Sequence, residues 1–232
     1  MPIQGNERML KMKAKKLSVL ILVVALGFSL TGNATTAGKL AIVPNGGIIL
    51  PLNGAFDSHD DLKDVVGAGP SFGLGLRYGL NNSFSVEGAF SWQWMNVEDD
   101  YKTISSKDPA FVLPALTLNG IYHLGPAMGS ETVSPFLTVG VGLYPWKLSE
   151  DGATGDAVVA PYDASEDFSK NSFGFNVGAG LDYFFTDQLA LNVGTRYIFV
   201  MSEDEDMFGS DFENQGFLKI NLGLLYCFPL GN

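Results

Sequence analysis

The feature that most constrains this 232-residue chain is a two-residue alternation of apolar with small or polar side chains, which recurs in separate segments. From 73 to 80, four large apolar residues alternate with three glycines and Arg77. Because successive side chains of a strand point to opposite faces, this period predicts a strand with one apolar face. The pattern returns over 84–94, 116–124, 137–143, 173–184, 189–199 and 218–228. An opening segment over 40–52, interrupted by two prolines, brings the predicted strands to eight.

The connections between these segments alternate in length. The short ones are three-residue turns at 81–83 and 186–188, and 125–135 is intermediate; the long ones are 52–68, 95–110, 147–171 and 201–216. An up-and-down barrel puts alternate connections at opposite ends, and membrane barrels carry long loops outside and short turns on the periplasmic side. The sequence therefore predicts an all-β fold, an eight-stranded antiparallel up-and-down transmembrane β-barrel with short periplasmic turns and long acidic extracellular loops.

The first 37 residues are typical of a secretory signal peptide. Four lysines between 11 and 16 precede an apolar run from Leu17 to Leu30, and the small-residue stretch TGNATTA follows. The run is short for a membrane-spanning helix, so a retained helical anchor is the alternative interpretation. We expect cleavage after Ala34 or Ala37, which leaves 38–232 as the barrel domain.

A soluble eight-stranded barrel would also alternate, with its apolar face inward and a polar outer surface. Here the second face is mostly Gly, Ser, Asn and Ala, which indicates a confined interior. The five charges of the seven better-defined strands all lie on that small-residue face: Arg77, Glu87, Asp182, Arg196 and Lys219. The apolar face carries the aromatic residues expected of an interfacial girdle: Trp92, Trp94, Tyr122, Tyr144, Tyr183, Tyr197 and Tyr226. Both faces favour a membrane barrel.

The segments FGFNVGAGLDYFFTDQLALNVGTRYIF and LTLNGIYHL resemble the small outer-membrane barrels of the OmpA transmembrane-domain and OmpW type. The resemblance covers most of the chain after the signal peptide. It implies a place in the outer membrane of a Gram-negative envelope, in contact with membrane lipid and lipopolysaccharide. The ending with Gly223, Tyr226 and Phe228 is similar to the C-terminal strand signal read by the barrel-assembly machinery, a partner during biogenesis. We expect a monomer that needs no cofactor.

The predicted inner face carries a candidate charge network. Folding two strands about Asn82 sets Arg77 opposite Glu87 and predicts a cross-strand ion pair. His123, Asp182, Arg196 and Lys219 extend this pair into a ladder along the lumen. The ladder either compensates buried charges only or re-pairs to open a narrow aqueous path. Ten inward glycines leave space for such a path: Gly73, Gly75, Gly79, Gly140, Gly142, Gly174, Gly178, Gly180, Gly194 and Gly223.

The negative charge is concentrated in the four long connections. They hold 20 of the 24 acidic residues after position 34 and 5 of the 9 basic ones, a net charge of −15. This rim should favour cations and repel anions, and the formal charge of −11 for the whole chain argues against nucleic acid. Runs of acids supply oxygen ligands for weak Ca²⁺ or Mg²⁺ sites: Asp60, Asp61, Asp64, Glu98, Asp99, Asp100, Glu203, Asp204, Glu205 and Asp206. Solvated loops with diffuse counterions are the alternative, because no loop has EF-hand spacing.

The first functional hypothesis is a non-enzymatic, porin-like channel for small solutes or cations. The alternative is a non-channel surface protein that acts in adhesion or envelope integrity through its acidic loops. A third hypothesis, a lipid A modifying enzyme, depends on His59 beside Asp57 and Ser58, or on His123. Neighbouring side chains in a loop rarely point at one another, so we predict no catalytic residue. One cysteine, Cys227, allows no internal disulfide and no zinc cluster.

Overall fold

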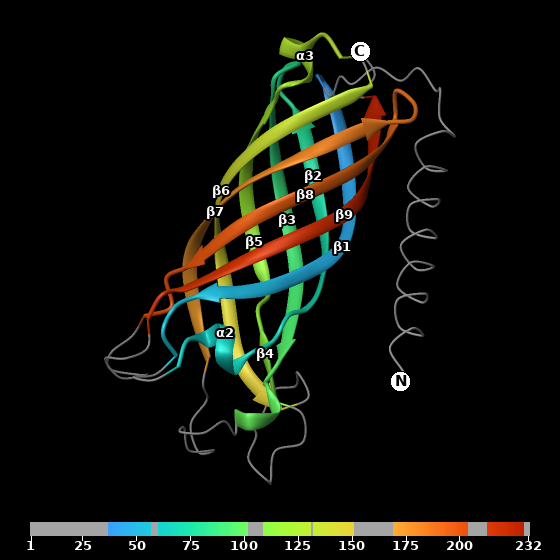
Figure 1. The fold of residues 1–232 in the computed structure, drawn as a ribbon. Helices are drawn as coiled ribbons and strands as arrows, with labels where there is room; N and C mark the ends of the chain where they lie inside the picture. The colour runs from blue at the N-terminus through green and yellow to red at the C-terminus, as the bar shows by residue number, and fades with distance from the viewer. Residues whose placement is uncertain are drawn as a thin grey trace, which may run out of the picture. The chain divides into compact units, whose positions relative to one another are not determined.

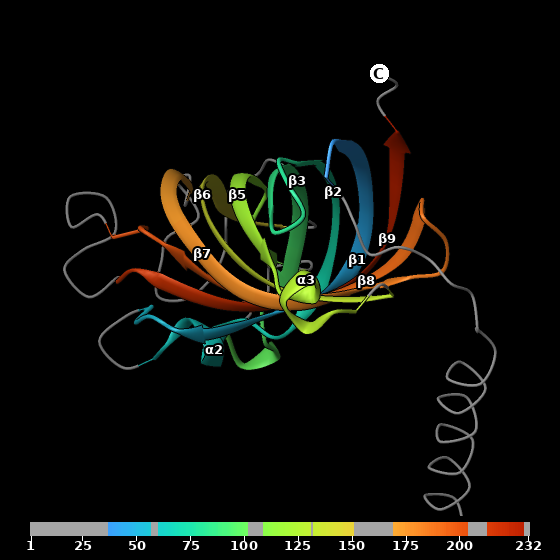
Figure 2. The same ribbon diagram turned by 90° about the horizontal axis from the view of Figure 1, so that it is seen from above.

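The computed structural model describes residues 37–56, 60–101, 109–130, 132–150, 169–203 and 213–229. These ranges form one closed antiparallel sheet around a common axis (Figures 1 and 2). Its strands are β1 (Lys39–Asn53), β2 (Gly69–Gly79), β3 (Phe84–Asn96), β4 (Pro109–Val112), β5 (Ala115–His123), β6 (Val133–Glu150), β7 (Ser169–Phe184), β8 (Leu189–Val200) and β9 (Gln215–Pro229).

Two features of the pairing make this sheet an eight-stranded barrel. Strands β4 and β5 follow one another along the same course, since both pair with β3 on one side and β6 on the other. Strand β1 pairs antiparallel with β9, from Lys39 opposite Pro229 to Asn53 opposite Gly216, and so closes the ring. The predicted all-β, up-and-down barrel is therefore confirmed.

Side-chain hydrogen bonds fix the two tight turns. Between β2 and β3, the Asn81 Oδ1 atom accepts hydrogen bonds from the backbone N–H groups of Ser83 and Phe84 at 2.8 and 2.9 Å. Between β7 and β8, the Thr186 hydroxyl accepts from Gln188 and Leu189 at 3.3 and 3.0 Å. At the same end, a short helix, α3 (Gly125–Met128), lies in the connection between β5 and β6. The opposite end carries the longer connections, with α2 (Leu62–Val65) and a 3-10 turn at Asp99–Tyr101.

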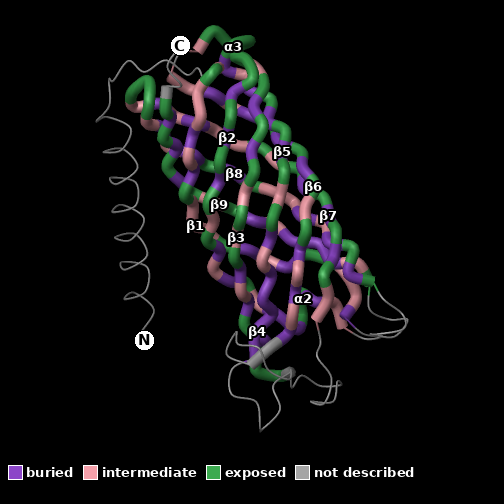
Figure 3. The backbone as a smooth tube through the Cα atoms, turned by 180° about the vertical axis from the view of Figure 1, so that it is seen from behind, coloured by how far each residue is buried: buried purple, intermediate pink, exposed green. Residues whose placement is uncertain are grey.

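The alternation of the sequence becomes an alternation of burial along each strand (Figure 3). Large apolar side chains on the outer face stay exposed, for example Leu76 at 55% and Val139 at 64%, whereas Arg77 and Asn119 are each 1% exposed. Most of the expected girdle is half-buried or exposed on the outside. Tyr144 is the exception: it is 1% exposed and points inward, so its assignment to the girdle was wrong. Its parity with Gly142 and Gly140 explains this, because alternate residues share a face.

Of the predicted signal peptide (1–37), residues 1–36 lie outside the described ranges, and its cleavage stays a prediction. In the part of the chain that is described, no helix is long and apolar enough to cross a bilayer.

Candidate functional site in the barrel lumen

Arg77 is the centre of a buried ionic network. The register between β2 and β3 sets Arg77 opposite Glu87, as the turn at Asn82 predicts. The Nε and Nη2 atoms of Arg77 donate to Glu87 Oε2 at 3.0 and 2.9 Å. Its Nη1 atom reaches across the lumen to Asp182 Oδ2 on β7 at 2.8 Å. The guanidinium also lies 5.4 Å from the centroid of the Phe136 ring, so a buried cation has two ion pairs and an aromatic face.

The remaining two charges of the predicted ladder lie on β8 and β9. Arg196 donates to Glu87 Oε1 at 2.7 Å, so that both carboxylate oxygens of Glu87 are occupied. Lys219 is directly opposite Arg196 in the β8–β9 register and is 7% exposed. Among the described residues, Lys219 has no hydrogen bond or ion pair. The structure thus brings four of the five strand charges together and leaves Lys219 beside them.

Neutral polar side chains on the same face, not singled out from the sequence, extend the network at Asn192 and form a separate amide pair beside it. Asn192 donates to Asp182 Oδ1 at 2.6 Å, and Asn176 donates to Asn119 Oδ1 at 3.0 Å. Their positions follow the same two-residue parity as the charges, which is the signal that could have identified them. The network therefore spans the lumen from β2 and β3 to β7 and β8.

His123 belongs to the lumen but not to the ionic ladder. Its Nε2 atom lies 2.9 Å from the Ser85 hydroxyl, and its Nδ1 atom lies 3.2 Å from the Ser134 hydroxyl. His123 is 3% exposed and Ser85 is 2% exposed, so a substrate outside the barrel cannot reach this pair. The contacts satisfy a buried imidazole. The other histidine considered for catalysis, His59, lies outside the described residues together with Asp57 and Ser58.

The polar layer borders a small, partly open cavity of about 40 Å³. That volume holds about three water molecules at roughly 10–15 Å³ each. Its walls carry the Arg196 and Lys219 side chains, Glu87, and the amides of Asn192 and Asn221.

Apolar clusters flank this polar layer on both sides. The cluster at the end with the long connections, called the loop-end cluster, comprises Ile49, Phe56, Leu62, Val65, Val66, Met95, Val97, Phe111, Leu113, Ala115, Tyr144, Trp146, Leu148, Ile198, Val200 and Phe217. Within it the Phe111 ring stacks on Trp146, with centroids 5.4 Å apart. The turn-end cluster comprises Ala41, Val43, Phe184, Ala190, Leu225 and Cys227. Small and polar residues therefore form the inner face in the middle of the barrel, and buried apolar side chains fill it toward both ends.

The inward glycines make room for large side chains rather than for a continuous aqueous path. A Cβ atom at Gly178 would lie 2.8 Å from Arg196 Cγ, and one at Gly174 would lie 3.0 Å from the Tyr144 ring. A Cβ atom at Gly180 would collide with the Phe136 ring. Because an eight-stranded barrel is narrow, each bulky inward residue needs a glycine on a facing or adjacent strand.

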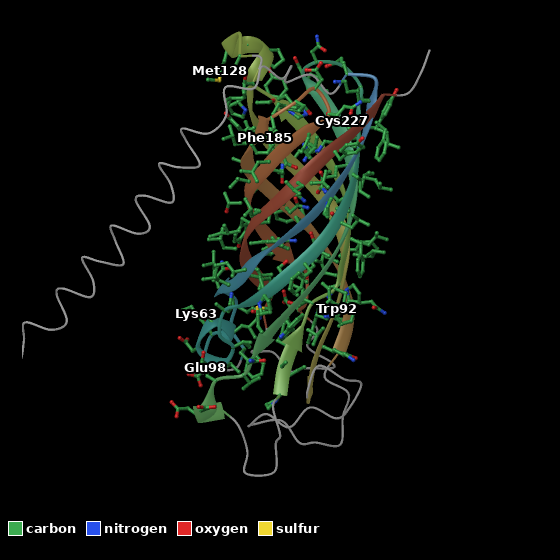
Figure 4. The ribbon with its side chains drawn as sticks, turned by 90° about the vertical axis from the view of Figure 1, so that its right-hand side faces the viewer. Lys63, Trp92, Glu98, Met128, Phe185 and Cys227 are labelled. Atoms are coloured by element: carbon green, nitrogen blue, oxygen red, sulfur yellow. The ribbon has the colours of Figure 1, made fainter. Side chains whose placement is uncertain are left out.

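Of the acidic residues proposed as weak cation ligands, those that the structure describes lie at the loop end. Figure 4 labels Lys63 and Glu98 at that end and Met128, Phe185 and Cys227 at the other. Asp61 and Asp64 both contact Lys63, the latter at 3.6 Å, and the hydrogen bond that Lys63 donates to Asp61 raises the pKa of Lys63. Glu203 accepts a hydrogen bond from Asn214 at 2.9 Å. Within the described ranges, no three His, Cys, Asp or Glu residues are grouped as metal ligands. Asp60, Glu98, Asp99 and Asp100 are described; Asp204, Glu205 and Asp206 are not.

The residues of the expected assembly signal lie on the strand that closes the barrel. Gly223 faces the lumen, where a Cβ atom would lie 2.6 Å from the Pro44 carbonyl oxygen. Tyr226 and Phe228 face outward, 40% and 46% exposed, with ring centroids 4.8 Å apart. Their recognition by an assembly machinery stays a prediction.

Comparisons with known proteins agree with this architecture. A family model described as the outer membrane protein beta-barrel domain matches residues 20–228. The solved structure of OprG from Pseudomonas aeruginosa has a TM-score of 0.55 and 15% identity, covering 86% of this chain and 99% of that one. The solved structure of Neisserial surface protein A has a TM-score of 0.52 and 16% identity, covering 83% of this chain and 98% of that one.

Ail, the attachment invasion locus protein of Yersinia pestis, was solved with the heparin analogue sucrose octasulfate. It gives a TM-score of 0.51 and 18% identity, covering 83% of this chain and 99% of that one. At these identities the likeness to solved structures shows the fold alone. No curated protein matches the chain.

Proposed function

Because the chain belongs to the outer membrane protein beta-barrel domain family, and is therefore an outer-membrane barrel, we propose that it acts as a surface protein with a closed barrel as its anchor. The observation that carries the proposal is the loop-end cluster, whose buried aromatic and aliphatic side chains fill the lumen between the ionic layer and the long connections. Water and ions enter an apolar, close-packed region only at a high free-energy cost. The barrel then anchors the protein in the membrane, and the loops carry its function.

The charge of the loops points to their partner. A net charge of −15 in the four long connections repels polyanions and attracts divalent cations. Lipopolysaccharide is also anionic, so we propose that Ca²⁺ or Mg²⁺ bridges its phosphates to the loop carboxylates and that this contact supports adhesion or envelope integrity. Diffuse binding of this kind needs no dedicated metal site. A ligand such as the heparin analogue bound by Ail does not fit an acidic rim.

Loop variants test this function. Residues 151–168 and 204–212 are replaced by short neutral linkers, outside the strand ends at Glu150 and Ser169. A matched variant keeps the length of 204–212 but carries amides in place of its acids. We expect both to fold, as shown by gel mobility before and after boiling, and to lose Mg²⁺-dependent association with lipopolysaccharide. Unchanged association in both variants contradicts the proposal.

A narrow channel is the second candidate, favoured by the polar cavity beside Glu87, Arg196 and Lys219. Opening it requires the loop-end cluster to move and Glu87 to change partners. Recording in planar bilayers separates the two functions: we expect no conductance steps from the purified barrel. Cation-selective steps that change in a Glu87→Gln variant overturn the closed-barrel proposal in favour of a channel.

An enzymatic function remains the third hypothesis. The outer-membrane barrels similar to this chain offer no catalytic parallel, and the described histidine is enclosed. Lipid A from cells that express the chain should keep its acylation pattern. An altered pattern that reverts in a His59→Ala variant contradicts this expectation.

A further inference from the structure

We propose that the central cavity of the lumen binds one small monovalent anion, of the size of a halide, against the Lys219 ammonium. The cavity, of about 40 Å³, is bounded by Lys219, Arg196, Asn192, Asn221 and Asn45. The site is independent of the loop function proposed above, because it lies in the lumen and is lined by residues of the strands.

The first argument is the charge balance of the ionic layer. Three cations, Arg77, Arg196 and Lys219, share the layer with two carboxylates, Glu87 and Asp182. Both carboxylates are already paired, Glu87 with the two arginines and Asp182 with Arg77. One positive charge of this largely buried layer is therefore left without a paired carboxylate among the described residues.

The second argument is the position of Lys219. It is 7% exposed, lines the cavity, and has no hydrogen bond or ion pair among the described residues. It also lies directly opposite Arg196 on the neighbouring strand, and like charges in opposed positions repel. An anion in the cavity compensates Lys219 and relieves this repulsion at the same time.

The third argument is the supply of donors around the cavity. Arg196 uses one of its five N–H groups on Glu87. The side-chain amide of Asn45 donates to the Val43 carbonyl oxygen at 3.2 Å, and that of Asn221 donates to Asn192 Oδ1 at 3.4 Å. Each of these two amides keeps a second N–H group. Glu87 also borders the cavity, but both of its oxygens accept charge-assisted bonds, so its repulsion of an anion is reduced.

The size of the cavity selects the class of anion. A volume of about 40 Å³ admits a halide and excludes a multi-atom organic anion such as gluconate. The test therefore compares sodium chloride with sodium gluconate at equal ionic strength, so that screening is constant. Unfolding by urea in lipid vesicles is followed by tryptophan fluorescence, because guanidinium chloride would itself supply the anion.

For the wild-type barrel, chloride at about ten times its dissociation constant should lower the unfolding equilibrium constant about tenfold relative to gluconate. A Lys219→Met variant should lose this dependence and, in gluconate, should be at least as stable as wild type. The matched control is Lys39→Met, at the turn end, where Lys39 donates to the Asp187 carbonyl oxygen; it should keep the full chloride effect.

A crystal grown in bromide adds a direct readout, with an anomalous peak expected at hydrogen-bonding distance from Lys219 Nζ. The proposal is overturned if wild type unfolds identically in both salts, if Lys219→Met keeps the dependence, or if bromide binds only elsewhere. Should Lys219→Met fail to fold, Lys219→Gln replaces it in the salt comparison and should likewise lose the chloride dependence.

Discussion

Replacing Arg77 by methionine should destabilise the barrel more than any other single change in the lumen. The variant removes both ion pairs of the guanidinium while filling most of its volume. Glu87 keeps Arg196 as a partner, but Asp182, which is fully buried, keeps only the hydrogen bond from Asn192. An uncompensated buried charge costs about 3–5 kcal/mol.

Among the described residues, Arg77 is the cation that pairs with Asp182, and Arg196 pairs with Glu87 instead. Asn192 on β8 lies opposite Asp182 on β7. Lys219 lies opposite Arg196, which is four positions beyond Asn192 along β8. Four positions of a strand are about 13 Å, which exceeds the reach of a lysine side chain. The predicted loss of about 3–5 kcal/mol corresponds to a roughly hundredfold to few-thousandfold change in the folding equilibrium constant.

Urea unfolding of the vesicle-inserted barrel measures this free energy, with gel mobility as a second probe of folding. The double variant Arg77→Met with Asp182→Asn removes the unpaired carboxylate and should regain part of the loss. Arg77→Lys, which keeps the charge but loses the bidentate geometry, should lose less than Arg77→Met. A loss below about 1 kcal/mol in Arg77→Met, or a double variant no more stable than the single one, refutes the reasoning.

Three further changes probe the wall and the packing. Gly180→Ala should cost about 1–3 kcal/mol by overpacking against Phe136, whereas Gly194→Ala, whose nearest neighbour would be 3.3 Å away, should cost much less in the same titration. Val141→Arg, at an outward position that is 62% exposed, should cost about 2–4 kcal/mol if that face meets lipid, and an unchanged stability argues against this orientation. Cys227, which is fully buried, should react with a maleimide only after boiling, and rapid labelling of the folded barrel contradicts its position inside.

The parts of the fold with a clear two-residue period could be predicted from the sequence, because only one face of each strand meets lipid. Parity alone gave the inward direction of the five strand charges, and the short turn at Asn82 gave the register of Arg77 and Glu87. Asp182 was expected in the ladder, but its direct pairing with Arg77 could not be found this way. Asp182 is 105 positions away, and only closure of the ring brings β7 across from β2.

Strand β4 shows why the period failed at the loop end. All four of its residues, Pro109–Val112, are buried, so no alternation marks them and the predicted strand begins only at 116. The same applies to the loop-end cluster, where Tyr144 and Trp146 extend the inward parity of β6 past the predicted end of that strand at 143. Where apolar residues lie on both faces of a strand, the two faces no longer differ in polarity, and no two-residue period marks the strand.

The pairing of Lys39 with Pro229 has a consequence for biogenesis. The ring cannot be completed until nearly the whole barrel sequence has reached the membrane. Until then the first strand keeps an open edge and the outward apolar residues remain in water, a state prone to edge-to-edge aggregation. We therefore expect delivery to need a partner that shields the nascent edge and an insertion step that follows the arrival of the last strand. A chain that loses β9 is left with two free edges and not with a slightly smaller barrel.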